Sequence, residues 1–481
     1  MSLRKNTLLN LLGVGIPTVI TLLTVPHYLR LIGAERYGAL TVLWSLMGYF
    51  GFMDLGMGRA VGQFLAGSAG KSALQRSGIV WTALISTTLI GVLAGVMFWI
   101  SSDFILTHWI SMSPDRLKEA LAAVPWFILG IPLLLGGAVL IGALQGRQMF
   151  LAKNVLTILT ASLGQIIPLA VAASGRVGID SLVPAMLFAR IVTIVMNFWY
   201  CRHRLPLGRT VRFQLSYLKP LLKYGGWVSL ISILEDLLES IDRLAIGAFA
   251  GAKAVALYTV PYNTVAKVRT LSYSFHSAIL PKMASESQQN ASDLALNASY
   301  ALASLMGIIA IPAIGIIHPF LVLWVGSDFA HQAQGVGEIV MLGVFLNSMV
   351  IAEQAFLMSH GKVRRLTMIY ILEVPVYLVL LWFCLQRFGI IGAALAWTAR
   401  MLVDVVMLLG ATKSFAAILR HCALVLFAVV AATALSYYMP ENDIYRWLGL
   451  LLCFMLALFS GREHLERMIP ERVKLMVKRI F

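Results

Sequence analysis

The sequence predicts an all-α polytopic membrane protein with about fourteen transmembrane helices, arranged as two six-helix lobes around a central cavity plus two appended helices. Of its 481 residues, 59% are hydrophobic and 12% are charged, whereas about a quarter of the residues of a soluble domain are charged. The mean hydropathy is +0.83. Apolar runs of about twenty residues recur along the whole chain, and a helix of that length crosses the hydrocarbon core of a bilayer.

The apolar runs are continuous, which favours helices, because the strands of a transmembrane barrel alternate polar and apolar residues over about ten positions. Hydropathy predicts twelve spans as a minimum and favours fourteen. The expected spans cover residues 8–30, 37–58, 77–100, 120–144, 151–173, 180–201, 220–248, 256–280, 294–320, 335–358, 365–386, 390–411, 418–438 and 445–460.

The basic residues indicate the orientation of these spans. With a cytoplasmic N-terminus, the cytoplasmic loops and tail contain 25 of the 38 Lys and Arg residues, and the opposite loops contain eight. This is the positive-inside bias, so both termini are expected to be cytoplasmic. The formal net charge of +16 then reflects membrane orientation, and no nucleic-acid partner is expected. The four cysteines are widely spaced without a metal-ligand pattern, so no metal site is expected.

A weak internal repeat supports the two-lobe prediction. Shifting the chain by 218 residues aligns Gly33-Ala34 with Gly251-Ala252, each at the turn between two expected spans. Six spans separate the copies, so both have the same orientation and the axis relating them runs along the membrane normal. The predicted domains are an N-lobe over 1–205, a C-lobe over 206–415, two appended helices over 416–460, and a basic tail over 461–481.

The linker between the lobes and the C-terminal tail are both basic. We expect the linker to lie against anionic membrane lipids on the cytoplasmic side. The tail repeats apolar residues at helical spacing among its cations, which is typical of an amphipathic helix at the interface. A solvated charged tail explains its composition equally well.

Five cations are predicted to line the cavity and to bind an anionic group: Arg59, Arg190, Lys267, Arg269 and Arg400. A charge inside a membrane span costs a few kcal/mol, so it usually faces a cavity or a partner. The planar fork of arginine binds two phosphate oxygens at once. The alternative is neutralisation by a nearby acid. Asp404 lies one turn from Arg400, which makes an ion pair there equally plausible. No acid stands one turn from Arg190, Lys267 or Arg269, which favours cavity lining.

The seventh expected span contains five charged residues within nine positions: Glu235, Asp236, Glu239, Asp242 and Arg243. Three of the acids share one helix face at positions i, i+4 and i+7. Such a row favours a coupling site for Na⁺ or H⁺ or part of a gate. The alternative, that basic residues of neighbouring helices neutralise this face, has equal weight.

Enzymatic chemistry is not indicated. The chain has no Gly-rich phosphate loop followed by Lys-Ser or Lys-Thr, and no triad spacing. The expected loops are about twenty residues or shorter, whereas glycosyl-lipid enzymes typically carry larger domains outside the membrane. We therefore expect a transporter without a cofactor. A membrane-embedded glycosyl-lipid enzyme, or a scaffold of a polysaccharide synthesis complex, is the alternative from another class.

Several short motifs carry a family resemblance, and they occur in a consistent order along the first twelve spans. They are Pro26-His27-Tyr28-Leu29, Gly33-Ala34-Glu35-Arg36-Tyr37-Gly38, Phe52-Met53-Asp54-Leu55-Gly56-Met57-Gly58-Arg59-Ala60, Ile241-Asp242-Arg243-Leu244, Gly361-Lys362 and Phe388-Gly389-Ile390. With these motifs the chain resembles the Wzx-like polysaccharide exporters and O-antigen flippases of the multidrug/oligosaccharidyl-lipid/polysaccharide superfamily.

The resemblance implies that an undecaprenyl-pyrophosphate-linked glycan crosses the bacterial inner membrane by alternating access, driven by an ion gradient. It implies that cavity arginines hold the pyrophosphate and that Asp54 and Arg59 belong to the inner gate. A polysaccharide polymerase and chain-length proteins are the implied partners. The first span has no basic residue between Lys5 and Arg30, unlike related lipid II flippases. A cation-coupled multidrug antiporter of the same superfamily is the rival interpretation.

Overall fold

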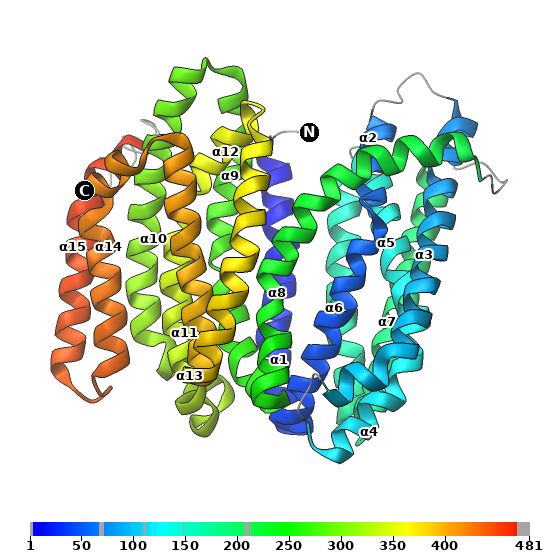
Figure 1. Ribbon diagram of the computed structural model, residues 1–481, viewed down its shortest axis with the longest axis horizontal. Coiled ribbons are helices and arrows are strands. Elements are labelled where there is room, and N and C mark those ends of the chain that lie inside the picture. The colour runs from blue at the N-terminus through cyan, green and yellow to red at the C-terminus, as the bar shows by residue number, and fades with distance from the viewer. Residues whose placement is uncertain are drawn as a thin grey trace. The chain divides into compact units, whose positions relative to one another are not determined.

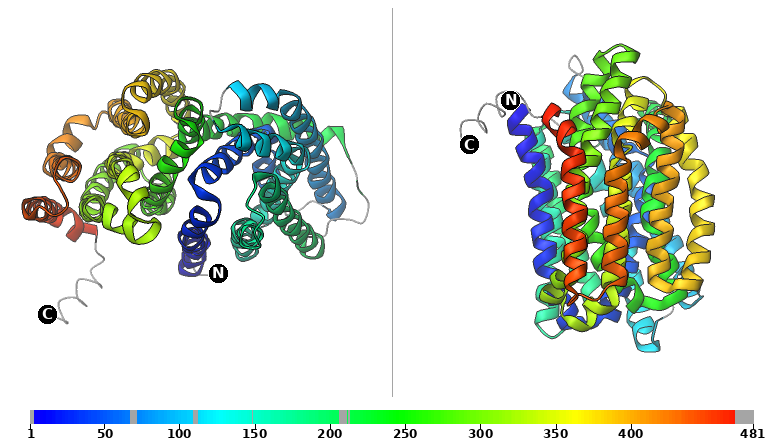
Figure 2. Two further views of the ribbon diagram at one scale, coloured as in Figure 1. Left: turned by 90° about the horizontal axis from the view of Figure 1, so that it is seen from below. Right: turned by 90° about the vertical axis from the view of Figure 1, so that its left-hand side faces the viewer.

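The computed structural model describes residues 3–66, 72–108, 112–147, 149–205, 211 and 213–468, and every regular element within them is helical (Figure 1). The chain divides into two compact units, Met1–Ala256 and Leu257–Phe481. Within each unit most of the long helices run side by side along a common direction, whereas the first part of α8 crosses the ends of its neighbours (Figures 1 and 2). The all-helical membrane fold predicted from composition and hydropathy is confirmed.

The first unit is built around α5. Its elements are α1 (Leu3–Phe50), the 3-10 turn η1 (Gly51–Asp54), α2 (Met57–Ala66), α3 (Ala73–His108), α4 (Pro114–Ala123), η2 (Val124–Trp126), α5 (Phe127–Gly146), α6 (Phe150–Ala173), α7 (Ile179–Arg204) and most of α8 (Leu215–Ala266). The helix α5 packs against α2, α3 and α7, while α6 packs against α1 and α7. The buried apolar side chains of α2, α3 and α5 form one core cluster.

The second unit is built around α10. Its elements are α9 (Arg269–Ser285), α10 (Gln288–Val325), α11 (Ser327–Ser348), α12 (Ile351–Ser359), α13 (Val363–Thr412), α14 (Phe415–Tyr438) and α15 (Ile444–Met468). The two helices predicted as appended, α14 and α15, pack against each other and against α10. The boundary between the units falls inside α8, and the predicted lobe boundary at residue 205 stays a prediction. Residues 469–481 of the predicted tail lie outside the described residues.

Three long helices are each divided by one glycine with a positive φ angle. The breaks are at Gly33 in α1 (φ 78°, ψ 164°), Gly251 in α8 (φ 82°, ψ 171°) and Gly389 in α13 (φ 56°, ψ −136°). At Gly33 and Gly389 the two arms reverse direction (Figure 1). Such φ values favour glycine, because a Cβ atom makes this region costly. The nearly identical angles at Gly33 and Gly251 match the repeat found in the sequence.

The helices carry the surface of a membrane protein. Eleven candidate membrane-spanning helices are present in the described residues, and counting the two arms of α1, α8 and α13 separately gives the fourteen segments predicted. Large apolar side chains project outward in both units, with Ile100, Leu323 and Phe459 exposed by 73%, 88% and 83%. Apolar surface on this scale is stable when hydrocarbon surrounds it. The chain is a multi-pass membrane protein.

Closely packed glycines join helices in the first unit. A Cβ atom on Gly142 of α5 would lie 1.9 Å from the carbonyl oxygen of Gly58 in α2, and one on Gly146 would lie 2.2 Å from that of Gly62. The four glycines form matching small-xxx-small patterns on facing helices, the pattern that brings helix backbones together in membranes. These glycines allow the backbones of α2 and α5 to contact each other directly, and α3 and α7 pack against the same helix α5.

Candidate functional site

The first unit contains a cavity of about 290 Å³ among α1, α5, α6 and α7, together with η2. Aromatic and aliphatic side chains form most of its wall, and glycines leave parts of the wall open. Its lining residues are Trp44, Met47, Gly48, Trp126, Gly130, Leu134, Thr160, Ala161, Gly164, Gln165, Val183, Met186, Leu187 and Arg190.

Arg190 of α7 gives this cavity its charge. Its side chain is half-buried, and among the described residues no acid lines the cavity. The Arg190 carbonyl oxygen accepts a hydrogen bond from the hydroxyl of Thr193 at 3.0 Å, a contact that involves the backbone and not the guanidinium group. A guanidinium group in a partly enclosed, apolar site favours an anion with several oxygen atoms, such as phosphate.

The cavity wall also suits a sugar. Trp44 and Trp126 offer aromatic faces, which stack on the C–H faces of sugar rings, and Gln165 and Thr160 offer polar atoms. The Gln165 carbonyl oxygen is fixed by the buried Tyr28 hydroxyl, which donates to it at 2.7 Å. Sequence reasoning singled out Arg190 and missed these neighbours, because they come from three separate elements, α1, η2 and α6, with no shared motif.

Gly48 and Gly164 keep the cavity open. A Cβ atom added at either position would meet nothing within 4 Å. Both glycines lie inside helices, where glycine destabilises by about 0.5–1 kcal/mol relative to alanine. Neither has a positive φ angle, so backbone conformation does not require glycine at these positions. Its effect there is to leave space in the cavity.

Arg269 and Arg400 lie in a buried polar cluster of the second unit. The Arg400 Nε atom donates to Glu373 Oε2 at 3.3 Å, and Glu373 is fully buried. Asp404 is close enough to interact electrostatically with Arg400, Arg269 and Glu373. The two cations are therefore matched by two carboxylates.

Aromatic rings complete this cluster. Arg269 donates to the Tyr273 hydroxyl at 2.7 Å, and its guanidinium carbon lies 5.8 Å from the Trp397 ring. Arg400 lies 5.8 Å from the Tyr377 ring. For both arginines this geometry fits the alternative interpretation, neutralisation by nearby acids. Glu373 is a partner that the sequence did not indicate. Their predicted role in substrate binding stays a prediction.

The other two predicted cations are exposed. Lys267 lies in the two-residue break between α8 and α9, which interrupts the helix inside the expected span 256–280. Arg59 lies in the first turn of α2 with an exposed side chain. An anion-binding role for either residue stays a prediction.

Asp54 has a local structural task. Its carboxylate accepts hydrogen bonds from the backbone N–H groups of Gly56 at 2.6 Å and Gly58 at 3.4 Å. Those donors lie at the start of α2, where N–H groups lack partners within the helix. Leu55 and Gly56 both have positive φ angles, so the carboxylate holds a sharp turn between η1 and α2. A gating role shared with Arg59 stays a prediction.

The charged stretch of α8 contains a local ion pair. Asp242 is fully buried and accepts from the Arg243 backbone N–H at 2.8 Å, while Arg243 Nη1 lies 3.5 Å from the same carboxylate oxygen. Arg243 also donates to the Glu239 carbonyl oxygen at 2.6 Å. The side chain of Glu235 lies outside the described residues. Ion coupling through this stretch stays a prediction.

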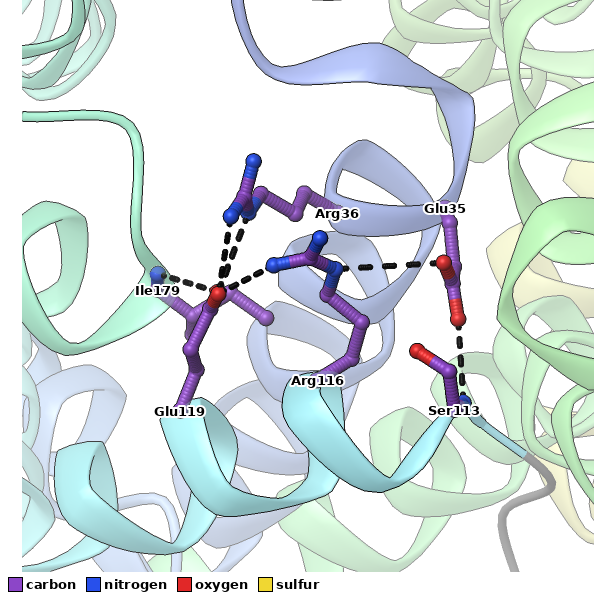
Figure 3. Close-up of polar contacts among 6 residues, drawn as sticks. All are labelled: Glu35, Arg36, Ser113, Arg116, Glu119 and Ile179. Atoms are coloured by element: carbon purple, nitrogen blue, oxygen red, sulfur yellow. Dashed lines mark hydrogen bonds and ion pairs between the residues drawn. The ribbon is translucent and has the colours of Figure 1, made fainter. Parts of the chain in front are cut away.

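A charged network that the sequence did not predict ties three parts of the first unit together (Figure 3). Arg36, three residues after the α1 turn, donates through Nε and Nη2 to Glu119 of α4 at 3.1 Å and 2.9 Å. Glu119 also contacts Arg116 and accepts from the Ile179 N–H, at the start of α7, at 3.1 Å. Glu35 accepts from the Ser113 N–H, which precedes α4, at 3.0 Å. The network fixes the Gly33 turn against α4 and α7.

Many apolar helices with short connections, and a cation-bearing cavity among them, define the class of multi-pass membrane transporters. The chain belongs to the polysaccharide biosynthesis protein family, whose family model matches residues 3–286. Over 412 residues it is 25% identical to a protein of Shigella flexneri named "Putative O-antigen transporter", covering 85% of this chain and 97% of that protein. The family resemblance carried by the sequence motifs is confirmed.

Solved structures show the same fold. The lipid II flippase MurJ, in an inward closed conformation, matches with a TM-score of 0.74 and 12% identity over 97% of this chain and 100% of its own. An inward-facing multidrug resistance transporter of the MATE family, in the MOP superfamily, matches with a TM-score of 0.69 and 14% identity over 85% of this chain and 99% of its own.

Proposed function

We propose that this protein carries a lipid-linked oligosaccharide, with undecaprenyl pyrophosphate as the lipid carrier, across the bacterial inner membrane. The Shigella relative named as an O-antigen transporter and the fold shared with a lipid II flippase support this class of substrate. The observation that carries the proposal is the cavity of the first unit, where Arg190 stands beside two tryptophans with no acid in the described lining.

The chemistry of the cavity fits a glycan attached to a phosphate group. The Arg190 guanidinium group supplies the charge for phosphate oxygens, and Trp44 and Trp126 supply stacking faces for sugar rings. Ligand pockets commonly enclose about 300–1,000 Å³, so a cavity of about 290 Å³ takes one or two sugar rings. The lipid tail stays in the bilayer, where hydrocarbon is its natural solvent.

The transport cycle proposed is alternating access, driven by a Na⁺ or H⁺ gradient. The charged stretch of α8, with Glu239, Asp242 and Arg243, is the candidate coupling region. Both termini are proposed to be cytoplasmic, on the basis of the distribution of basic residues. A polysaccharide polymerase and chain-length proteins would then receive the glycan on the opposite side.

A multidrug antiporter is the second candidate, favoured by the fold shared with a MATE family transporter. Such a protein exports cations, for which a carboxylate is the natural binding group. Within the described lining, the cavity presents an arginine and no carboxylate. The charge therefore favours the anionic substrate.

Replacing Arg190 tests the proposal. In a strain that lacks the native transporter, Arg190→Gln should lower surface polysaccharide about 10- to 100-fold, since a charge-assisted hydrogen bond contributes about 1.5–3 kcal/mol. Arg190→Lys should retain part of the export. The control is Arg176→Gln, which removes an exposed arginine of the same unit. Unchanged export by Arg190→Gln, at equal amounts of folded protein, would overturn the proposal.

A further inference from the structure

The second unit has a basic groove at the turn between α12 and α13. It is an open groove of about 550 Å³, and its residues lie more than 100 positions along the chain from those of the cavity in the first unit. Its lining residues are Gly361, Lys362, Arg364, Arg365, Met368, Ile369, Met407 and Ala411. Three cations stand at one part of the groove, and no acid lines it among the described residues. The proposed transport function leaves this groove unexplained.

The start of α13 adds further positive potential to the groove. Lys362 is its N-cap residue and makes no side-chain capping bond, and the first turn of α13 contains no acid. The first N–H groups of a helix lack partners within the helix, and its dipole is positive at this end. These donors and the neighbouring cations favour the same ligand, an anion with several acceptor oxygens.

The cations are placed differently. The Lys362 ammonium lies 5.0 Å from the centre of the Phe356 ring, which restrains it by a cation–π contact. Arg364 and Arg365 are exposed. Their guanidinium groups are therefore hydrated in the free protein and accessible to a ligand. Basic residues that only set the orientation of a membrane protein do not need to line a groove. Here all three cations line one.

The remainder of the groove is apolar. Met368 and Ile369 follow the cations by one turn of α13, and Met407 and Ala411 come from its second arm. Met368 is 48% exposed, which is unfavourable beside water and favourable beside an acyl chain. The groove thus presents cations at one end and methylene-compatible side chains next to them, which matches the two parts of a phospholipid.

We propose that this groove binds an anionic glycerophospholipid, with Lys362, Arg364, Arg365 and the α13 N-terminus around the phosphate and the methionines against the acyl chains. This assignment does not depend on the transported substrate. Bound lipid would connect the end of α12 with both arms of α13 and would restrain the Gly361 turn, where φ is 70°.

Native mass spectrometry of the full-length protein tests the proposal, with phosphatidylglycerol and phosphatidylcholine as probes. Phosphatidylglycerol should bind more tightly, and Arg364→Gln/Arg365→Gln should weaken its binding about 30-fold, since each cation near a lipid surface contributes about 1 kcal/mol. The control is Lys413→Gln/Arg420→Gln, which removes two exposed cations outside the groove and should leave binding unchanged.

Two outcomes would overturn this assignment. One is equal binding of phosphatidylglycerol to the wild type and to the Arg364→Gln/Arg365→Gln variant, when thermal denaturation shows that both proteins are folded. The other is displacement of the lipid by inorganic phosphate at the same concentration, which would mean that the apolar part of the groove contributes nothing. Both readouts are separate from polysaccharide export, so they stand whether or not the transport proposal holds.

Discussion

At the scale of single residues, the same side chain has different surroundings in the two units. Arg190 borders a cavity without acids in its described lining, whereas Arg400 lies against Glu373 and Asp404 in a closed polar cluster. Opposite charges offset part of the cost of burying an arginine, so the charge of Arg400 is explained without a ligand, whereas the charge of Arg190 is not. Charge in a membrane span is therefore a sign of function only after its partners are known.

The open space at Gly164 leads to a test of the cavity. Gly164→Trp should abolish polysaccharide export while the protein stays folded, because the added ring fills space in which a Cβ atom meets nothing within 4 Å. Gly164→Ala should keep export and stabilise α6 slightly. Export is measured by complementation and folding by size-exclusion chromatography. Gly15→Trp is the control, since Gly15 also has open space but does not line the cavity.

The buried pair of Glu373 and Arg400 should be energetically coupled. Arg400→Ala and Glu373→Ala should each lower the midpoint of thermal unfolding, because each leaves a buried charge without its partner. The double variant should be more stable than the sum of the single effects implies, with a coupling of about 1–3 kcal/mol. Additive effects in thermal denaturation would show that the two side chains do not act as a pair.

The sequence predicted the charged residues of the site better than their partners. Arg190 could be identified because a lone cation in an apolar run is costly in a membrane. Glu373 could not be assigned to Arg400, because the two are 27 positions apart and meet only after α13 reverses at Gly389. Asp54 was expected at a gate, yet its bonds to Gly56 and Gly58 are local and visible only in the backbone geometry.

At the scale of elements, small residues decide how closely helices pack. The pairs Gly58 with Gly142 and Gly62 with Gly146 bring α2 and α5 into backbone contact, and Gly91 and Gly95 of α3 meet α5 at Pro132 and Ile128. Between apolar helices in lipid, hydrophobic burial gives little net attraction, so close van der Waals packing takes its place.

Enlarging Gly142 should separate these helices. Gly142→Leu places a side chain where even its Cβ atom would lie 1.9 Å from the Gly58 carbonyl oxygen. We expect destabilisation at or above the usual range of about 1–3 kcal/mol for overpacking, seen as a lower unfolding midpoint in detergent. Gly15→Leu serves as the matched control and should unfold like the wild type. An unchanged midpoint for Gly142→Leu would contradict the observed packing.

Turns between spans were predictable and breaks within spans were not. The turns at Gly33, Gly251 and Gly389 coincide with interruptions of hydropathy, and Gly33 and Gly251 are also the glycines of the repeat. The break between α8 and α9 falls at Lys267 and Val268, without a glycine or proline, so no local sequence preference marks it. Hydropathy measures the length of an apolar run and is insensitive to a change in backbone direction inside it.

At the scale of the whole molecule, the basic residues make a prediction about orientation. A fluorescent protein that folds only in the cytoplasm should fluoresce when fused after Phe481, and alkaline phosphatase at the same point should be inactive. Alkaline phosphatase inserted after Arg176, in an expected outer loop, should be active. The physical reason is the retention of Lys- and Arg-rich loops on the cytoplasmic side. The reverse pattern would contradict the predicted orientation.

The glycine turns also bear on how the chain enters the bilayer during synthesis. Helix resumes directly after Gly33 in α1 and after Gly389 in α13, so no slack segment separates one arm from the next. We therefore expect each pair of arms to insert into the bilayer together, as a hairpin. In the proposed orientation these tips, beside Arg36 and Arg387, cross the bilayer, so the apolar flanks of each hairpin have to offset the transfer of a cation. Insertion of each arm consequently depends on the other arm of its pair, and shortening one arm should impair the insertion of both.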